Sequence, residues 1–204
     1  MTATSIVRLK INLDDVKPVV MRRITVRFGI RLDRLHTIVQ AAMGWSNSHL
    51  WWEFRAGGTG WGPSDPDVGF GDGPLDARKA TLLRVLNDVG GKTIKYLYDF
   101  GDGWEHTIKI ERIFPDVPGL DQPFLLEATG RCPPEDIGGP GGYMAFLAAF
   151  ADPTHGRHAV FAERYGADFD PHGVNVRQLE ADLRAIAERS RPKVPSKDRR
   201  SEKP

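Results

Sequence analysis

The side chains best suited to chemistry lie in two short segments of this 204-residue chain. The first segment runs from Asp99 to His106 with the sequence Asp-Phe-Gly-Asp-Gly-Trp-Glu-His, and it supplies three carboxylates and one imidazole. Carboxylates and imidazoles are common ligands of hard or borderline divalent cations. A divalent metal ion is therefore a candidate cofactor, with the candidate ligands Asp99, Asp102, Glu105 and His106. Two other interpretations remain open, a solvated sheet end and a structural salt bridge.

The second segment, from Cys132 to Tyr143, has the sequence Cys-Pro-Pro-Glu-Asp-Ile-Gly-Gly-Pro-Gly-Gly-Tyr. Its prolines stiffen the backbone, and its glycines allow another group to approach closely. Three interpretations stay open: a packed structural loop, an anion site at the start of a helix, or a loop that completes the first site. In the last case the ligand or acid is Cys132, Glu135 or Asp136. Cys132 would act as a nucleophile only beside a base such as His49 or His106.

A β-hairpin is expected to position the first segment. Its strands are predicted over Lys92–Phe100 and Trp104–Ile113, joined by a three-residue turn. This register places Tyr98 opposite His106 on an aromatic face and Asp99 opposite Glu105 on the other face. Because like charges across a strand pair are destabilising, the register predicts a cation, a shared proton, a basic side chain or solvent between these two carboxylates.

The remaining elements indicate an α+β fold built on a mainly antiparallel β-sheet. Alternating hydrophobic residues predict strands over Val7–Leu13 and Val20–Val26. Helical spacing from Leu35 to Ala42 predicts a helix after these two strands, with Asp33 as its N-cap and Gly44 at its end. Two more strands are predicted at 49–55, with Leu50, Trp52 and Phe54 on one side, and at 124–128, and a long loop is predicted at 56–74. Further helices are predicted at 81–86, 143–150, 160–165 and 176–186, so that helices gather at the C-terminus.

Composition limits the class of protein. The longest apolar run, Tyr143–Ala151, is nine residues long, which is too short for a membrane span. The single cysteine excludes an internal disulfide, and the N-terminus carries no signal-peptide pattern. We therefore expect a soluble, cytoplasmic protein that does not bind a membrane.

Charge is distributed unevenly along the chain. Residues 191–204 hold six basic and two acidic residues, which leaves 22 basic and 25 acidic residues in the rest. We expect one domain over residues 1–190 and a basic, disordered tail over residues 191–204. The acidic body disfavours duplex DNA as a partner, so nucleic acid remains a candidate only through the tail.

Both segments, taken together, resemble the plasmid pRiA4b ORF-3-like family, and the resemblance covers about residues 5–187. Further matching positions are Arg22-Arg23, Leu35-His36, Ala42-Met43-Gly44-Trp45, His49 and Asp168-Phe169-Asp170-Pro171. The resemblance implies an origin in a plasmid or transposon, where members are often labelled insertion-element passenger or resolvase-like proteins. It implies no substrate, activity or catalytic residue.

Three functions remain open. The first is a binding or accessory domain with a pocket formed by the hairpin and the second segment. The second is a metal-dependent hydrolase or nuclease-like enzyme that uses the same carboxylates with His106 or His49. The third is a nucleic-acid accessory protein that acts through the basic tail. The candidate pocket residues are His49, Tyr98, Asp99, Asp102, Trp104, Glu105, His106, Cys132, Glu135, Asp136 and Tyr143.

Overall fold

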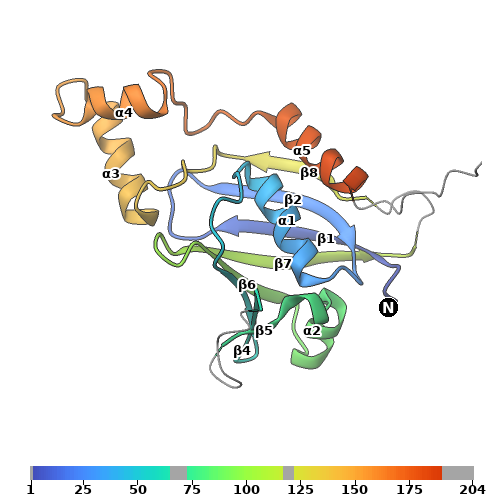
Figure 1. Cartoon of the computed structure of the whole chain (residues 1–204). Coiled ribbons are helices and arrows are strands. Elements are labelled where there is room, and N and C mark those ends of the chain that lie inside the picture. Colours follow the sequence, from blue (N-terminus) through green and yellow to red (C-terminus); the bar gives the residue numbers. More distant parts are fainter. Residues whose placement is uncertain (1, 65–72, 117–121, 190–204) are drawn as a thin grey trace, which may run out of the picture.

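An eight-stranded sheet forms the centre of the molecule in a computed structural model, which describes residues 2–64, 73–116 and 122–189 (Figure 1). The strand order is β5-β4-β3-β6-β7-β1-β2-β8, and only the β4–β5 pair is parallel. The α+β prediction with a mainly antiparallel sheet is confirmed. The strands are β1 (Ile6–Leu13), β2 (Val20–Arg27), β3 (Trp52–Ala56), β4 (Thr59–Gly62), β5 (Leu75–Asp76), β6 (Thr93–Tyr98), β7 (Trp104–Phe114) and β8 (Phe124–Thr129).

Helices cover the sheet at several places (Figure 1). Helix α1 lies across one face of the sheet, and α5 packs against both α1 and β8. Helices α3 and α4 contact each other at one end of the molecule, which confirms the predicted helical C-terminal part. The helices are α1 (Leu32–Met43), the 3-10 turn η1 (Ala77–Lys79), α2 (Leu82–Val89), α3 (Gly139–Ala151), α4 (His158–Tyr165) and α5 (Val176–Arg189).

The core follows the two hydrophobic periods of the sequence. Val7, Leu9 and Ile11 of β1 are fully buried and point to one face of the sheet. Leu35 and Val39 of α1, four residues apart on one side of the helix, are also fully buried. Burial of these two apolar faces against each other fixes α1 on the sheet.

Helix α1 begins earlier than predicted. Its N-cap is Arg31, and Asp33 lies in the first turn, where its carboxylate accepts a hydrogen bond from the Arg31 guanidinium at 2.7 Å. The predicted Asp33 N-cap is therefore wrong, because this carboxylate is engaged by a neighbouring side chain. The end of the helix is as predicted, since Gly44 adopts a left-handed conformation with φ of 89°.

The strand predicted to begin at residue 49 begins at Trp52. Asn47 has φ of +60°, which turns the chain away from the sheet before the strand starts. Leu50 is consequently 80% exposed and does not share the buried face of Trp52 and Phe54. Strand β4 occupies part of the predicted 56–74 loop, and residues 65–72 of that loop lie outside the described residues.

The register of the β6–β7 hairpin differs from the predicted one by two residues. Tyr98 pairs with Trp104 and Tyr96 with His106, so five residues, Asp99 to Gly103, form the connection. Asp99 adopts φ of +53°, and its carbonyl accepts a hydrogen bond from the Gly103 amide at 2.7 Å, which closes the longer turn. The aromatic side chains still share one face of the hairpin, because a shift of two residues leaves every side chain on the face predicted for it.

A further difference concerns helix α3. Helix α3 starts at Gly139 instead of Tyr143, and it is half exposed, with Met144 at the surface. The predicted basic tail lies outside the described residues. No helix within the described ranges combines the length and the apolar character that crossing a membrane requires.

Candidate functional site

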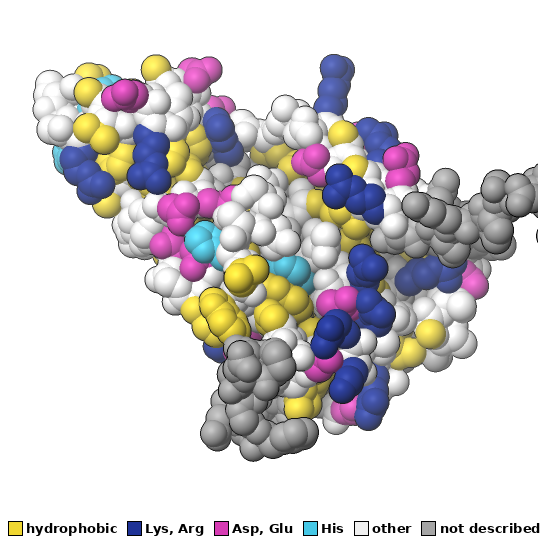
Figure 2. Space-filling view, in the orientation of Figure 1, with side chains coloured by type: hydrophobic (Ala, Val, Ile, Leu, Met, Phe, Trp, Pro, Cys, Tyr) yellow, Lys and Arg dark blue, Asp and Glu magenta, His cyan; other side chains and the backbone are white. Residues whose placement is uncertain are grey.

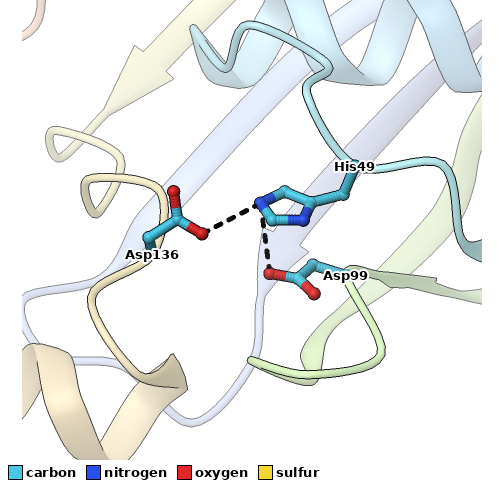
Figure 3. A group of neighbouring side chains, drawn as sticks. All are labelled: His49, Asp99 and Asp136. Carbon is cyan, nitrogen blue, oxygen red and sulfur yellow. Dashed lines mark ion pairs between the residues drawn. The ribbon is translucent and has the colours of Figure 1, made fainter.

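Three side chains from distant parts of the sequence converge at one end of the sheet (Figure 3). Nε2 of His49 lies 3.4 Å from Oδ2 of Asp99 and 3.3 Å from Oδ1 of Asp136. One ligand atom from each residue lies within 4.8 Å of the other two. We call His49, Asp99 and Asp136 the triad. Within residues 2–64, 73–116 and 122–189, it is the one group of at least three His, Cys, Asp or Glu side chains with this geometry.

The turn of the hairpin holds Asp99 in place. Its amide donates a hydrogen bond to the Trp51 carbonyl at 3.1 Å, which ties the turn to the segment that carries His49. Oδ1 of Asp99 accepts a hydrogen bond from the Gly101 amide at 3.0 Å, and Oδ2 faces His49. Asp is one of the few residues other than glycine that tolerate this left-handed backbone conformation. One carboxylate thus serves both the turn and the triad.

The hairpin tip also contacts the segment that carries Asp136. The Gly138 amide donates a hydrogen bond to Oδ2 of Asp102 at 3.2 Å. A negative charge is favourable here, because the free amides at the start of α3 carry a partial positive charge. The negative group at the start of α3 is thus the Asp102 carboxylate of the chain itself. This contact brings the two sequence segments together.

Glu135 joins three parts of the site. Oε1 accepts hydrogen bonds from the hydroxyls of Tyr98 at 2.7 Å and Ser48 at 3.0 Å. Oε2 accepts from the Ser46 amide at 3.0 Å and from the Ser46 hydroxyl. Partial burial acts to raise the pKa of Glu135, but these hydrogen bonds outweigh it and hold the pKa below its ordinary value. An ionised Glu135 therefore holds Ser46 and Ser48, which precede His49, close to the segment that carries Asp136.

The spacing within the triad suits a bound cation. With metal–ligand bonds of about 2.0–2.2 Å, adjacent ligand atoms lie about 3.0–3.5 Å apart. The two measured distances from His49 Nε2 fall in that range. Nε2 is inaccessible to solvent and makes no hydrogen bond of normal geometry, although two carboxylates face it. One nitrogen and two carboxylate oxygens form a donor set suited to Zn²⁺, Mn²⁺ or Fe²⁺.

The predicted metal ligands other than Asp99 have different environments. His106 is fully buried, and its Nδ1 donates to the backbone carbonyls of Trp104 at 3.1 Å and Tyr96 at 3.2 Å. Burial lowers the pKa of His106 to about 4. Glu105 is exposed on β7, opposite Leu97 instead of Asp99, so the expected carboxylate repulsion does not arise. Asp102 binds the Gly138 amide. Local sequence spacing therefore did not identify the group that converges.

The other predicted residues line the surroundings of the triad. Tyr98 and Trp104 are buried, and both rings contact Trp45, at centroid distances of 5.1 Å and 5.7 Å. Burial raises the pKa of the Cys132 thiol, which disfavours a nucleophilic thiolate. Burial also raises the pKa of Tyr143 to about 12, and its hydroxyl has no hydrogen-bond partner among the described residues.

The hairpin and the second segment contact each other directly, because the Tyr98 hydroxyl donates to Glu135 and the Gly138 amide donates to Asp102, and the pocket between them stays a prediction. A cavity of about 650 Å³ lies elsewhere along this segment. It is bounded by the end of α1, by residues 131–135 and by residues of the 164–182 region. The hairpin does not line it.

Sequence reasoning missed Ser46 and Ser48, which hold Glu135. The predicted roles of His49 are a base for Cys132, a pocket residue and, as the alternative to His106, the imidazole of a metal-dependent hydrolase, and in the structure His49 provides the nitrogen of the triad. The signal available in the sequence was the cluster Ser46-Asn47-Ser48-His49 directly after the helix-ending Gly44-Trp45. Its partners are about fifty and ninety residues away, so no local pattern connects them.

Comparison with known proteins agrees with this architecture. The chain is 59% identical over 176 residues to the uncharacterized protein y4hQ of Sinorhizobium fredii (strain NBRC 101917 / NGR234), covering 86% of this chain and 89% of that protein. It resembles the crystal structure of the protein of unknown function MM3350 from Methanosarcina mazei Go1, with a TM-score of 0.74 and 29% identity. That match covers 85% of this chain and 96% of the other. Residues 5–178 match the family model, and the chain belongs to the plasmid pRiA4b ORF-3-like protein family.

Proposed function

We propose that this protein binds one divalent transition-metal ion through the triad and uses it to activate water for hydrolysis. The observation that carries the proposal is the convergence of His49, Asp99 and Asp136, with their ligand atoms within 4.8 Å of one another. Three protein ligands leave coordination positions for water and substrate, which is the usual arrangement of catalytic metal sites. A bound metal lowers the pKa of its water to about 7 and so supplies hydroxide at neutral pH.

The solvent exposure of one side of the triad supports a catalytic metal site over a purely structural one. The Asp136 side chain is 63% exposed, whereas that of Asp99 is 12% exposed. The triad therefore has a buried side, held by the hairpin turn, and an open side at Asp136. Water and a substrate would approach from the open side.

Hydrophobic side chains follow two of the ligands in sequence. Leu50 and Trp51 come after His49, Phe100 comes after Asp99, and all three are at least 49% exposed. Figure 2 shows acidic and histidine side chains together on this face, with a hydrophobic patch beside them. Exposed aromatic and aliphatic groups next to a polar site favour a substrate that has an apolar part beside its hydrolysable bond.

Elemental analysis of tag-free protein tests the metal site. We expect about one equivalent of Zn, Mn or Fe in the wild type and its loss in Asp99→Asn and Asp136→Asn. Glu105→Gln is the matched control, because Glu105 lies on the same hairpin outside the triad, and it should retain the metal. If both Asp variants keep the metal, or if the wild type binds none when titrated with Zn²⁺ and Mn²⁺, the triad is an ion pair centred on His49.

A second assay separates hydrolysis from binding alone. Metal-loaded protein is incubated with 4-nitrophenyl butyrate and with bis(4-nitrophenyl) phosphate, which represent esters and phosphodiesters. We expect metal-dependent turnover of one of them that disappears in Asp99→Asn and survives in Glu105→Gln. Stoichiometric metal without turnover of either substrate would contradict the hydrolase and favour a metal-binding accessory domain.

A further inference from the structure

The cavity of about 650 Å³ has the size of a site for a small molecule. Its walls are the end of α1, the 131–135 segment, the end of α4 and the first turns of α5. His49, Asp99 and Asp136 do not line it, so it is separate from the triad. Among its lining residues are three arginines, Arg22, Arg131 and Arg164.

Arg22 is a buried charge without an acidic partner. Arg22 is 1% exposed, and its guanidinium forms no ion pair with an Asp or Glu in the described part of the chain. Nε donates to the Ala42 carbonyl at 2.7 Å, and Nη1 donates to the carbonyls of Met21, Thr129 and Gly130 at 2.8–3.0 Å. Nη2 donates to no residue that the structure describes. Burial of an arginine is costly, and a negative group at Nη2 would offset that cost.

The two other arginines have no carboxylate partner either, within the described ranges. Arg131 lies over the Phe169 ring at 4.3 Å and Arg164 over the Tyr165 ring at 5.2 Å, so aromatic faces hold their guanidinium groups. The carboxylates among the lining residues belong to Glu135 and Asp182. Glu135 accepts hydrogen bonds from Ser46, Ser48 and Tyr98, and Asp182 accepts one from Gln178 at 2.9 Å. The arginines therefore remain available to an external anion.

The wall also has an apolar part. Phe169 and Leu179 are buried, and Tyr165 and Val174 are partly buried beside them. We propose that this cavity binds a small organic anion, in which a carboxylate or phosphate group contacts the arginines and an apolar portion packs against Phe169, Leu179 and Val174. Guanidinium groups bind both kinds of oxyanion through paired hydrogen bonds.

Isothermal titration of the full chain with benzoate, phenyl phosphate and inorganic phosphate tests this site. We expect saturable binding of benzoate or phenyl phosphate, and the probe that binds identifies the oxyanion. The double variant Arg131→Gln/Arg164→Gln should raise Kd by about tenfold or more. Both side chains are exposed, so the fold should survive. Arg34→Gln, an exposed arginine on α1 outside the cavity lining, should leave Kd unchanged.

Two further variants locate the anion. Arg22→Lys keeps the charge but loses the guanidinium fork, so binding should fall if the variant is folded by circular dichroism; if it unfolds, the double variant decides. Asp136→Asn should bind the probe as the wild type does, which excludes an anion held by a metal at the triad. The proposal is overturned if no probe saturates in the millimolar range, if the double variant binds normally, or if inorganic phosphate binds as tightly as phenyl phosphate.

Discussion

The Tyr98 hydroxyl donates a 2.7 Å hydrogen bond to the Glu135 carboxylate and thereby joins the hairpin to the segment before α3. The two residues are 37 positions apart, and each is next to a triad member, Asp99 and Asp136 respectively. Burial and the neighbouring carboxylate raise the pKa of Tyr98 well above its ordinary value, so its hydroxyl stays a donor at neutral pH. The bond therefore links the chain next to Asp99 to the chain next to Asp136.

Tyr98→Phe should loosen the triad. Loss of one hydrogen bond to a charged acceptor should reduce the free energy of unfolding by about 1.5–3 kcal/mol and weaken Zn²⁺ binding, because Asp136 is no longer held toward Asp99. Urea denaturation and zinc titration measure the two effects. Tyr143→Phe is the matched control, since that buried hydroxyl has no hydrogen-bond partner in the described part of the chain and its removal should be neutral. Equal behaviour of the two variants would refute the role of the Tyr98 bond.

Metal binding should stabilise the wild type. At a free Zn²⁺ concentration of about 100 times Kd, linkage adds about 2.7 kcal/mol to the free energy of unfolding. Asp136→Asn should lose this gain and keep the metal-free stability, because its side chain is 63% exposed. Thermal unfolding with Zn²⁺ and with EDTA measures both quantities. A Zn²⁺-dependent rise in Tm that is as large in Asp136→Asn would place the metal elsewhere.

Close packing of the two segments predicts opposite effects at two glycines of α3. Gly139 has φ of +68°, and a Cβ there would overlap the Asp102 carbonyl oxygen. Gly139→Ala should therefore lower the free energy of unfolding by about 2–3 kcal/mol. A Cβ at Gly141 would meet no atom of the described residues within 4 Å, so Gly141→Ala should raise stability by about 0.5–1 kcal/mol through helix propensity. Chemical denaturation compares them, and a tolerated Gly139→Ala would mean that the contact with Asp102 is loose.

Acid should destabilise the fold through His106. Its pKa is about 4 in the folded state and about 6.5 when unfolded, so the unfolded chain binds more protons between these values. Stability conferred by the neutral ring is complete above pH 6.5 and falls as the pH drops toward 4, by up to about 3 kcal/mol. The buried Nε2 has no hydrogen-bond partner to accept its proton among the residues that the structure describes.

His106→Gln should make the dependence of unfolding free energy on pH between 6.5 and 4 less steep, and buried His36, whose pKa is also lowered to about 4, should account for a remaining part. His155→Gln serves as the control, because His155 is exposed. Urea denaturation at a series of pH values makes the comparison. A slope in His106→Gln as steep as in the wild type would assign the acid sensitivity to other groups.

The sequence by itself determined the elements with a strong hydrophobic period. The alternation from Val7 to Leu13, the helical spacing from Leu35 to Ala42 and the glycine at residue 44 predicted β1, α1 and the end of α1 correctly. These features are local, because each depends on side chains a few residues apart that share one buried face. The α+β class follows from their order along the chain.

Only the tertiary structure decided the register of the hairpin. A turn of three residues and one of five both sort the strands into the same faces, so alternation does not distinguish them. The left-handed Asp99, held by bonds to Gly101, Gly103 and Trp51, selects the longer turn. The bond to Trp51 comes from a segment that is remote in sequence.

The membership of the triad was also decided by the tertiary structure. Asp99 belonged to the predicted metal ligands, but the sequence grouped it with its neighbours Asp102, Glu105 and His106. Strand alternation places His106 in the core, and the amide of Gly138, the N-cap of α3, donates to Asp102. The sheet and α1 bring His49 and Asp136 to Asp99 instead. A sequence shows the residue types directly. The convergence of three segments depends on long-range packing, which no local sequence pattern predicts.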